Sequence, residues 1–186
     1  MQTPSDHPPK ITLRRYLDVA SHTGLAAGLD DVFFQSSNTQ TFASAEVRDK
    51  FRERWLGRYL GSYPQWTYVA LTADRRVAGY LAGCLDDPAR TALFSDNVHF
   101  AIFRDLTAQF PAHLHVNLAA DYRGDGIGSA LVERFCGDAR NAGAGGVHVI
   151  TGRGARNVGF YTRNGFLTRG VTGEGAAEVV FLGRTL

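Results

Sequence analysis

The run Arg123-Gly124-Asp125-Gly126-Ile127-Gly128 constrains the fold more than any other stretch of this chain. It lies between an alternating apolar segment, His113 to Leu118, and a segment whose apolar residues recur at helical spacing from Ile127 onward. A turn that leaves a strand and opens a helix gathers backbone N–H groups without partners in the helix, and the helix dipole adds positive potential there. The pattern therefore predicts an α/β arrangement with an anion-binding turn.

The glycines of this turn favour a pyrophosphate as the anion. Glycine at 124, 126 and 128 leaves room near the main chain, while Arg123 can add a charge and Ser129 a hydroxyl donor. A dinucleotide fingerprint would need a third glycine where this chain has Ser129, and a Walker loop would need a lysine next to the turn. A turn chosen only for tight bending is the alternative interpretation, but such a turn manages with one glycine.

The other segments predict further helices and strands of one domain, residues 10–186, after a short disordered lead-in at residues 1–9. We expect strands at Ile11–Tyr16, Thr67–Thr72, Arg76–Leu85, His113–Leu118, Val147–Thr151, Phe166–Val171 and Glu178–Leu182. We expect helices within Asp18–Asp30, from Ser44 to Leu60, within Asp86–Pro111 as one or two short ones, from Ile127 to the glycines near 143–146, and at Asn157–Arg163.

Composition argues against several classes of partner. Lys plus Arg number 20 against 18 for Asp plus Glu, with no dense basic run, so we expect no nucleic-acid binding. No apolar stretch is long enough to span a bilayer, and we expect no membrane association. Cys84 and Cys136 lack metal-ligand spacing, which predicts reduced core residues, a cytoplasmic location and no metal.

A second motif follows the glycine turn at Asn157-Val158-Gly159-Phe160-Tyr161-Thr162-Arg163-Asn164-Gly165-Phe166. Together with the R-x-x-G-x-G pattern of Arg123, Gly126 and Gly128, it resembles the two signatures of the GNAT superfamily of acetyltransferases. The resemblance implies an α/β (α+β) fold with one mixed, mostly antiparallel sheet flanked by helices. It also implies that the strands at 113–118 and 147–151 are parallel and splay apart around acetyl-CoA.

The resemblance also assigns residues to the cofactor. It implies that acetyl-CoA is bound by the strand end, the glycine turn and the short helix: Leu118, Ala119, Ala120, Arg123, Gly124, Asp125, Gly126, Ile127, Gly128, Ser129, Asn157, Phe160 and Tyr161. A backbone N–H near Leu118, freed by a bulge, would polarise the thioester carbonyl. Asn157 would bond the pantetheine amides, or serve as the N-cap of its helix, or do both.

Transfer of an acetyl group expels a thiolate, which needs a proton. A tyrosine, with an ordinary pKa of about 10, is an acid of suitable strength for a thiolate whose thiol has a pKa of about 8.5. The resemblance places Tyr161 beside the thioester sulfur, so Tyr161 is the expected general acid. The alternative is that Tyr161 only packs with Phe160 in the core.

An amine acceptor attacks only when unprotonated, and histidine suits the task of base near neutral pH. Alternation places His113, His115 and Asn117 on one face of their strand and Leu114, Val116 and Leu118 on the other. The His-Leu-His run is similar to that of serotonin N-acetyltransferase and of the acetyltransferase-like domain attached to some O-GlcNAc hydrolases. We expect His113 or His115 to be the base, the alternative being hydrogen-bonded structural histidines.

The remaining histidines, at 7, 22, 99 and 148, are interpreted as structural. Aromatic side chains of the N-terminal region and of Asp86–Pro111 could line an acceptor pocket, although most should be core: Phe33, Phe34, Tyr63, Trp66, Phe94, Phe100 and Phe103. The expected function is acetyl-CoA-dependent N-acetyl transfer to a small-molecule or peptide amine, with a homodimer left open. A non-catalytic acyl-CoA-binding or interaction module is the alternative.

Overall fold

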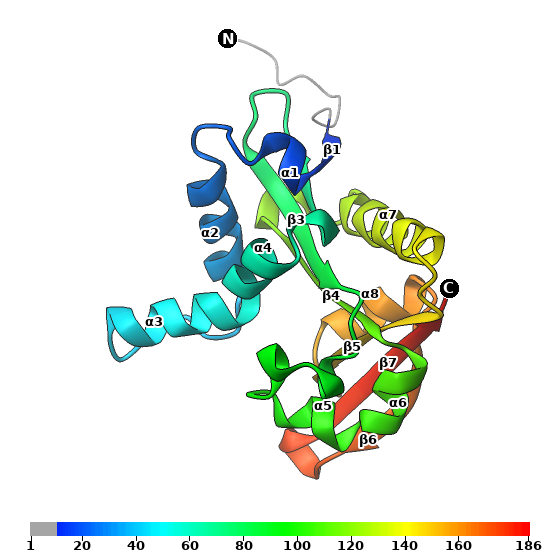
Figure 1. The fold of residues 1–186 in the computed structure, drawn as a ribbon. Helices are drawn as coiled ribbons and strands as arrows, with labels where there is room; N and C mark the ends of the chain where they lie inside the picture. Colours follow the sequence, from blue (N-terminus) through cyan, green and yellow to red (C-terminus); the bar gives the residue numbers. More distant parts are fainter. Residues whose placement is uncertain (1–10) are drawn as a thin grey trace.

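The computed structural model describes residues 11–186, which form a seven-stranded sheet with helices packed on both faces (Figure 1). The strand order is β1-β2-β3-β4-β5-β7-β6. Within this sheet β4 and β5 are parallel, and the other neighbouring strands are antiparallel. The predicted fold class is therefore confirmed, while the predicted lead-in at residues 1–9 lies outside the described residues.

The strands lie close to their predicted positions. They are β1 (Thr12–Arg15), β2 (Thr67–Leu71), β3 (Val77–Cys84), β4 (Ala112–Leu118), β5 (Gly146–Gly152), β6 (Leu167–Thr172) and β7 (Val179–Thr185). The principal helices are α1 (Tyr16–Val19), α2 (Leu25–Ser36), α3 (Ala45–Arg52), α4 (Arg58–Ser62), α5 (Val98–Ile102), α6 (Arg104–Gln109), α7 (Ile127–Asn141) and α8 (Asn157–Arg163). Short turns of 3-10 helix join several of them.

The N-terminal helices differ most from their predicted bounds. Helix α2 begins and ends later than the predicted segment 18–30, because Gly24 caps it in a left-handed conformation with φ of 81°. The long helix predicted from Ser44 is present, and the Ser44 hydroxyl accepts a hydrogen bond from the N–H of Val47. A π-helical turn, η1 (Glu53–Gly57), interrupts it between α3 and α4, and the helix ends at Ser62, two residues beyond its predicted end at Leu60.

Strands β4 and β5 pair over a short distance and then separate. Their register joins only Ala112 with Val147 and His113 with His148, although each strand continues for several residues. From there β4 stays paired with β3, and β5 stays paired with β7. The predicted splay of the parallel pair is thus present, at the carboxyl ends of the two strands.

The sheet separates two apolar cores. Helices α7 and α8 cover one face, where Leu114 packs with Leu131 and Phe135. Helices α2 and α4 and the segment 88–102 cover the other face. Because successive strand residues point to opposite faces, His113 and His115 share one face of β4, as predicted, and this is the face toward α2. Most of the seven aromatic side chains considered for an acceptor pocket are packed in these cores.

The two cysteines are buried core residues, as predicted. Cys84 lies in the core on the α2 side and Cys136 in the core under α7, and both are free thiols. Burial raises the pKa of Cys84 to about 12 and that of Cys136 to about 11. Both side chains are therefore neutral thiols near pH 7 and serve as small apolar packing residues.

Candidate active site

A cavity of about 600 Å³ opens where β4 and β5 separate. Its walls come from α2, the end of β4, the glycine turn, the start of α7 and helix α8: Ser36, Asn38, Val116, Asn117, Leu118, Arg123, Gly124, Gly126, Gly128, Ser129, Ala155, Arg156, Asn157, Phe160, Tyr161 and Arg163. Asn117 points to the α2 face of the sheet, and Val116 and Leu118 point to the α7 face. Residues of both faces of β4 therefore line one cavity.

The glycine turn forms one end of the cavity. Gly124 has φ of 99° and Gly126 has φ of 77°, and open space surrounds the position of a Cβ at either residue. Their left-handed backbone therefore accounts for these two glycines, because other residues pay a conformational penalty there. The first regular helical bond of α7 runs from the N–H of Ala130 to the carbonyl of Gly126. The preceding N–H groups are left for an anion at the helix N-terminus.

Gly128 has a different role from the other two glycines. A Cβ on Gly128 would lie 3.1 Å from the ring of Phe160 and 3.3 Å from a methyl group of Leu118. The absence of a side chain allows α8 and the end of β4 to pack closely against α7. Gly128 thus shapes the cavity by letting Phe160 form its wall.

The end of β4 directs two peptide groups into the splay. The N–H of Ala119 donates to the carbonyl of Ala78 on β3. Because hydrogen bonding alternates along an antiparallel pair, Leu118 directs its own N–H and C=O away from β3, toward the gap left by β5. The register between β3 and β4 has no shift, so the predicted bulge is wrong. The N–H is free because β5 has diverged.

Arg123 lies beside this strand end. Its Nε donates to the carbonyl of Leu118 at 3.0 Å, and its Nη2 lies 3.4 Å from the hydroxyl of Ser36. The Ser36 hydroxyl donates to the same carbonyl at 3.2 Å. The guanidinium is therefore at the cavity wall, as predicted, but these contacts of its side chain are with protein groups.

Asn157 reaches the cavity from the first turn of α8. Its carboxamide oxygen accepts a hydrogen bond of 3.0 Å from the Thr151 hydroxyl on β5. The helix is capped by Arg156 without a side-chain hydrogen bond, so the alternative prediction of Asn157 as N-cap is wrong. The side chain is tied to β5, across the gap from β4.

Tyr161 combines packing with access to the cavity. It is 3% exposed and packs against Phe160 and Phe166, with ring centroids 5.1 and 5.4 Å away. It also lines the cavity on the α7 side of the splay. Burial raises the pKa of Tyr161 above its ordinary value, so the hydroxyl holds its proton at neutral pH. Both interpretations of Tyr161 agree with this position.

His113 lies outside the cavity lining, within an aromatic cluster. Its ring is 2% exposed and contacts Tyr59, Phe94, Phe100 and His148. Neither ring nitrogen has a hydrogen-bond partner among residues 11–186. Burial holds the pKa of His113 well below its usual range, so the imidazole is neutral. Its surroundings are those of a core residue.

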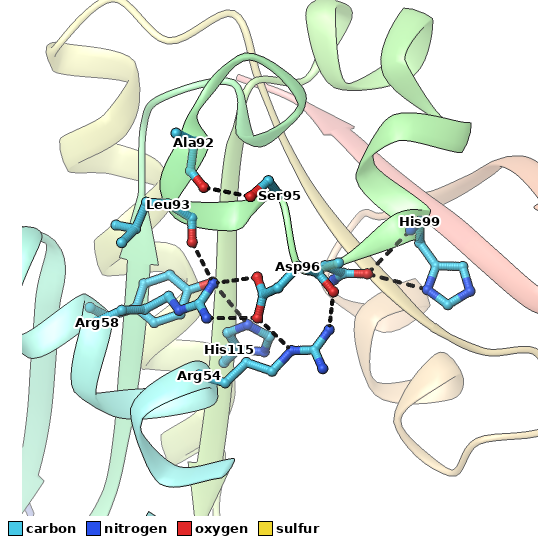
Figure 2. A network of polar contacts seen from close by, with 10 residues as sticks. Arg54, Arg58, Ala92, Leu93, Ser95, Asp96, His99 and His115 are labelled. Carbon is cyan, nitrogen blue, oxygen red and sulfur yellow. Dashed lines mark hydrogen bonds and ion pairs between the residues drawn. The ribbon is translucent and has the colours of Figure 1, made fainter. Parts of the chain in front are cut away.

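His115 is half-buried and, like His113, does not line the cavity, although it lies two residues nearer the end of β4. Its Nε2 lies 3.1 Å from the Tyr59 hydroxyl, and the edge of its ring meets Trp55. Figure 2 shows it beside the ion pairs that join Arg54 and Arg58 to Asp96. Burial, with a smaller effect of the Arg58 charge, lowers the pKa of His115 to about 4.

Of the histidines interpreted as structural, His148 and His99 each have a hydrogen-bond partner for Nδ1, whereas Nδ1 of His22 has none among residues 11–186. His148 is buried beneath Phe181 and its Nδ1 bonds the carbonyl of Phe110. His7 lies outside the described residues. The structural assignment of His148 rests on this carbonyl bond and on the stacked aromatic ring.

Most predicted cofactor residues meet at the cavity. Four do not line it: Ala119, Ala120, Asp125 and Ile127. Ile127 is buried in the core under α7, while Ala120 and Asp125 are exposed. Sequence reasoning missed several lining residues, namely Ser36, Asn38, Val116, Asn117, Ala155, Arg156 and Arg163. Two of these, Ser36 and Asn38, lie far from the motifs in sequence, and no pattern marks them.

The fold and this cavity define an α/β protein with an anion-binding turn beside a splayed pair of parallel strands, and a family comparison says which one. The family model described as an acetyltransferase (GNAT) domain matches residues 64–167, more than half of the chain. The chain belongs to the GNAT acetyltransferases. No protein of curated function matches it significantly.

Solved structures share the fold at low sequence identity. The structure of SsHAT has a TM-score of 0.76 and 21% identity, covering 95% of this chain and 98% of its own. A GCN5-related N-acetyltransferase from Kribbella flavida has a TM-score of 0.64 and 18% identity, covering 95% and 98%. A chain from the NatC complex bound to Gag peptide and CoA has a TM-score of 0.61 and 14% identity, covering 95% and 99%.

Within residues 11–186, no group of three or more His, Cys, Asp or Glu side chains is arranged to hold a metal ion. No helix in that part of the chain has the length and apolar character needed to cross a membrane.

Proposed function

We propose that this acetyltransferase moves the acetyl group of acetyl-CoA to a primary amine within the cavity at the β4–β5 splay. The observation that carries the proposal is the cavity itself, which joins the free N–H groups of the glycine turn to the buried hydroxyl of Tyr161. Its volume of about 600 Å³ lies in the range of cofactor sites.

The charges around the cavity suit the phosphates of CoA. The lining residues that carry charge are the arginines Arg123, Arg156 and Arg163, and none of the described lining residues is acidic. Two positive-φ glycines leave open space at the turn, where a phosphate could approach the N-terminus of α7. The same lack of carboxylates makes the cavity a poor fit for a polycationic acceptor.

Tyr161 is the proposed general acid. As the amine nitrogen attacks the thioester carbon, an N–C bond forms and the C–S bond breaks, and the leaving thiolate takes the proton of the Tyr161 hydroxyl. The N–H groups at the end of β4, on Leu118 and on Val116 beside the Tyr161 hydroxyl, would stabilise the charge that develops on the carbonyl oxygen. The products are an acetamide and the free thiol of CoA.

His115 is the proposed proton acceptor, rather than His113. It is half-buried and shares a strand face with the lining residue Asn117, whereas His113 is enclosed by aromatic rings. With a pKa of about 4 it is a weak base, so it would act through water once attack has made the amine nitrogen cationic and acidic. Its proton would then pass to solvent, and solvent would return a proton to the Tyr161 phenolate, so that both residues regain their starting states.

Release of free thiol from acetyl-CoA tests this function. The wild-type protein would be incubated with acetyl-CoA and separate panels of arylalkylamines, polyamines, amino acids, amino sugars and peptides. We expect thiol release that depends on one class of amine, with a matching acetamide found by mass spectrometry. Binding of acetyl-CoA without release by any amine would instead favour the non-catalytic acyl-CoA-binding module.

A further inference from the structure

The carbonyl of Leu118 marks the point where β4 loses its neighbour. On one side β4 remains bonded to β3, through the N–H of Ala119 and the carbonyl of Ala78. On the other side β5 has diverged, since their register ends at His113 and His148. The Leu118 carbonyl points to that open side and would lack a partner there.

Two side chains replace the missing strand. The Ser36 hydroxyl and the Arg123 Nε both donate to the Leu118 carbonyl, at 3.2 and 3.0 Å. Arg123 Nη2 lies a further 3.4 Å from the Ser36 hydroxyl. We call this set of contacts the Leu118 hydrogen-bond triangle. It joins the last residue of α2, the end of β4 and the first residue of the glycine turn.

The Leu118 hydrogen-bond triangle holds the part of β4 that would face the thioester. Val116 and Leu118 direct their N–H groups to the same open side of β4 as the Leu118 carbonyl. A strand end held on only one side can rotate about its last dihedral angles. Anchoring the carbonyl therefore fixes the direction of the neighbouring N–H groups, and small errors in such directions are costly in a catalytic site.

The same contacts argue against a phosphate as the main partner of Arg123. Two of its donor groups are engaged by Leu118 and Ser36. Arg156 and Arg163 also line the cavity, and neither forms an ion pair with a carboxylate among residues 11–186, so they remain for the anionic ligand. Arg123 thus differs from them in its bonds to the main chain.

We propose that Ser36 and Arg123 are positioning residues, which orient the end of β4 toward the thioester carbonyl instead of binding the phosphates. The proposal rests on the proposed function, because it assumes a thioester in this cavity. It adds a residue of α2, Ser36, to the machinery, and it reassigns Arg123 from the phosphates to the strand.

Isotope-edited infrared spectroscopy of bound acetyl-CoA tests the proposal without an identified acceptor. The carbonyl of acetyl-CoA labelled with carbon-13 shifts to lower frequency when N–H donors polarise it. Ser36→Ala removes the hydroxyl, and Arg123→Lys keeps the charge but loses the Nε donor. Ser36→Thr keeps a hydroxyl. Ser37→Ala is the matched control, because the Ser37 hydroxyl bonds the carbonyl of Phe33 within its own helix.

We expect Ser36→Ala and Arg123→Lys to reverse part of the frequency shift and to lower turnover of any accepted amine about tenfold. Ser36→Thr and Ser37→Ala should keep the wild-type spectrum. Calorimetry with adenosine 3′-phosphate 5′-diphosphate, which has the phosphates without the thioester, should give wild-type affinity for both test variants. Circular dichroism and thermal melts check that each variant folds.

Two results would overturn the proposal. One is a wild-type carbonyl frequency in both Ser36→Ala and Arg123→Lys. The other is that Arg123→Lys loses as much affinity for the phosphate fragment as it loses for acetyl-CoA. That result would show that Arg123 binds the phosphates. Failure of the proposed function looks different, because the wild-type protein itself would then either fail to bind acetyl-CoA or release no thiol with any amine, whatever the variants do.

Discussion

At the scale of single residues, the proposed chemistry depends on Tyr161. Its ring is held by Phe160 and Phe166, and its environment keeps the hydroxyl protonated at neutral pH. A phenylalanine would keep the packing and remove only the proton. The packing and catalytic roles of Tyr161 can therefore be separated by one substitution.

We predict that Tyr161→Phe lowers kcat by about a hundredfold, because general acid catalysis contributes effects of that order. Affinity for acetyl-CoA, measured by calorimetry, should stay near the wild-type value. Tyr68→Phe is the control, because it removes another hydroxyl from the same core, one bonded to Asp138. Turnover that is unchanged in Tyr161→Phe would remove Tyr161 from the mechanism.

Residue patterns in the sequence identified the glycine turn and Tyr161, because both lie in short, local motifs. They did not show why each glycine is required, because the left-handed φ of Gly124 and the contact of Gly128 with Phe160 depend on tertiary structure. Nor could they choose between the two histidines. Alternation gives His113 and His115 the same face, and only packing encloses one of them more than the other.

At the scale of elements, α7 shows how one helix can hold glycines for opposite reasons. Gly137 lies in the middle of α7 with open space around its Cβ position, whereas Gly128 faces Phe160 and Leu118. Glycine in a helix interior is less favourable than alanine by about 1 kcal/mol. At Gly128 the close approach of Phe160 and Leu118 accounts for the glycine. At Gly137 no contact among the described residues offsets the cost.

We predict that Gly137→Ala raises the free energy of unfolding by about 0.5 to 1 kcal/mol, measured by urea denaturation. Gly128→Ala should fail to stabilise the protein and should weaken acetyl-CoA binding, because the new methyl group meets the ring of Phe160 at 3.1 Å. Equal stabilisation by both substitutions would show that α8 does not pack on α7 as described.

The elements themselves were predictable where hydrophobic patterns are strong. The hairpin of β2 and β3, helix α7 and helix α8 lie close to their expected positions. Helix α2 was misplaced because its apolar residues begin before Gly24, and the sequence does not reveal that Gly24 adopts a left-handed conformation. The π-helical turn η1 likewise depends on packing rather than on residue type.

At the scale of the whole molecule, buried histidines link stability to pH. His113 and His148 lie side by side in the core, with ring centroids 5.6 Å apart. Burial lowers the pKa of His148 to about 4 and holds that of His113 well below its usual range. In the unfolded chain both titrate near 6.5, so below this pH the unfolded state binds more protons than the folded one.

We predict that stability is greatest above about pH 6.5 and falls as the pH drops from there toward 4, with roughly 2 kcal/mol lost from His148 at pH 5 and a further loss from His113. Urea denaturation at pH 7.5 and at pH 5 measures this loss. His113→Phe, which fits an aromatic cluster that offers no hydrogen bond to the ring among the described residues, should reduce it. An identical pH dependence in this variant would contradict the assignment.

The central claim, that the cavity at the splay holds acetyl-CoA by the N-terminus of α7, is tested most directly by calorimetric titration with acetyl-CoA. Gly126→Asp places a carboxylate at that terminus, and Gly143→Asp places one beyond the other end of the same helix, again at a residue with positive φ and open space. The matched backbone makes the conformational cost of the two substitutions similar. We predict that Gly126→Asp abolishes binding while Gly143→Asp keeps wild-type affinity; wild-type affinity in Gly126→Asp would contradict the account.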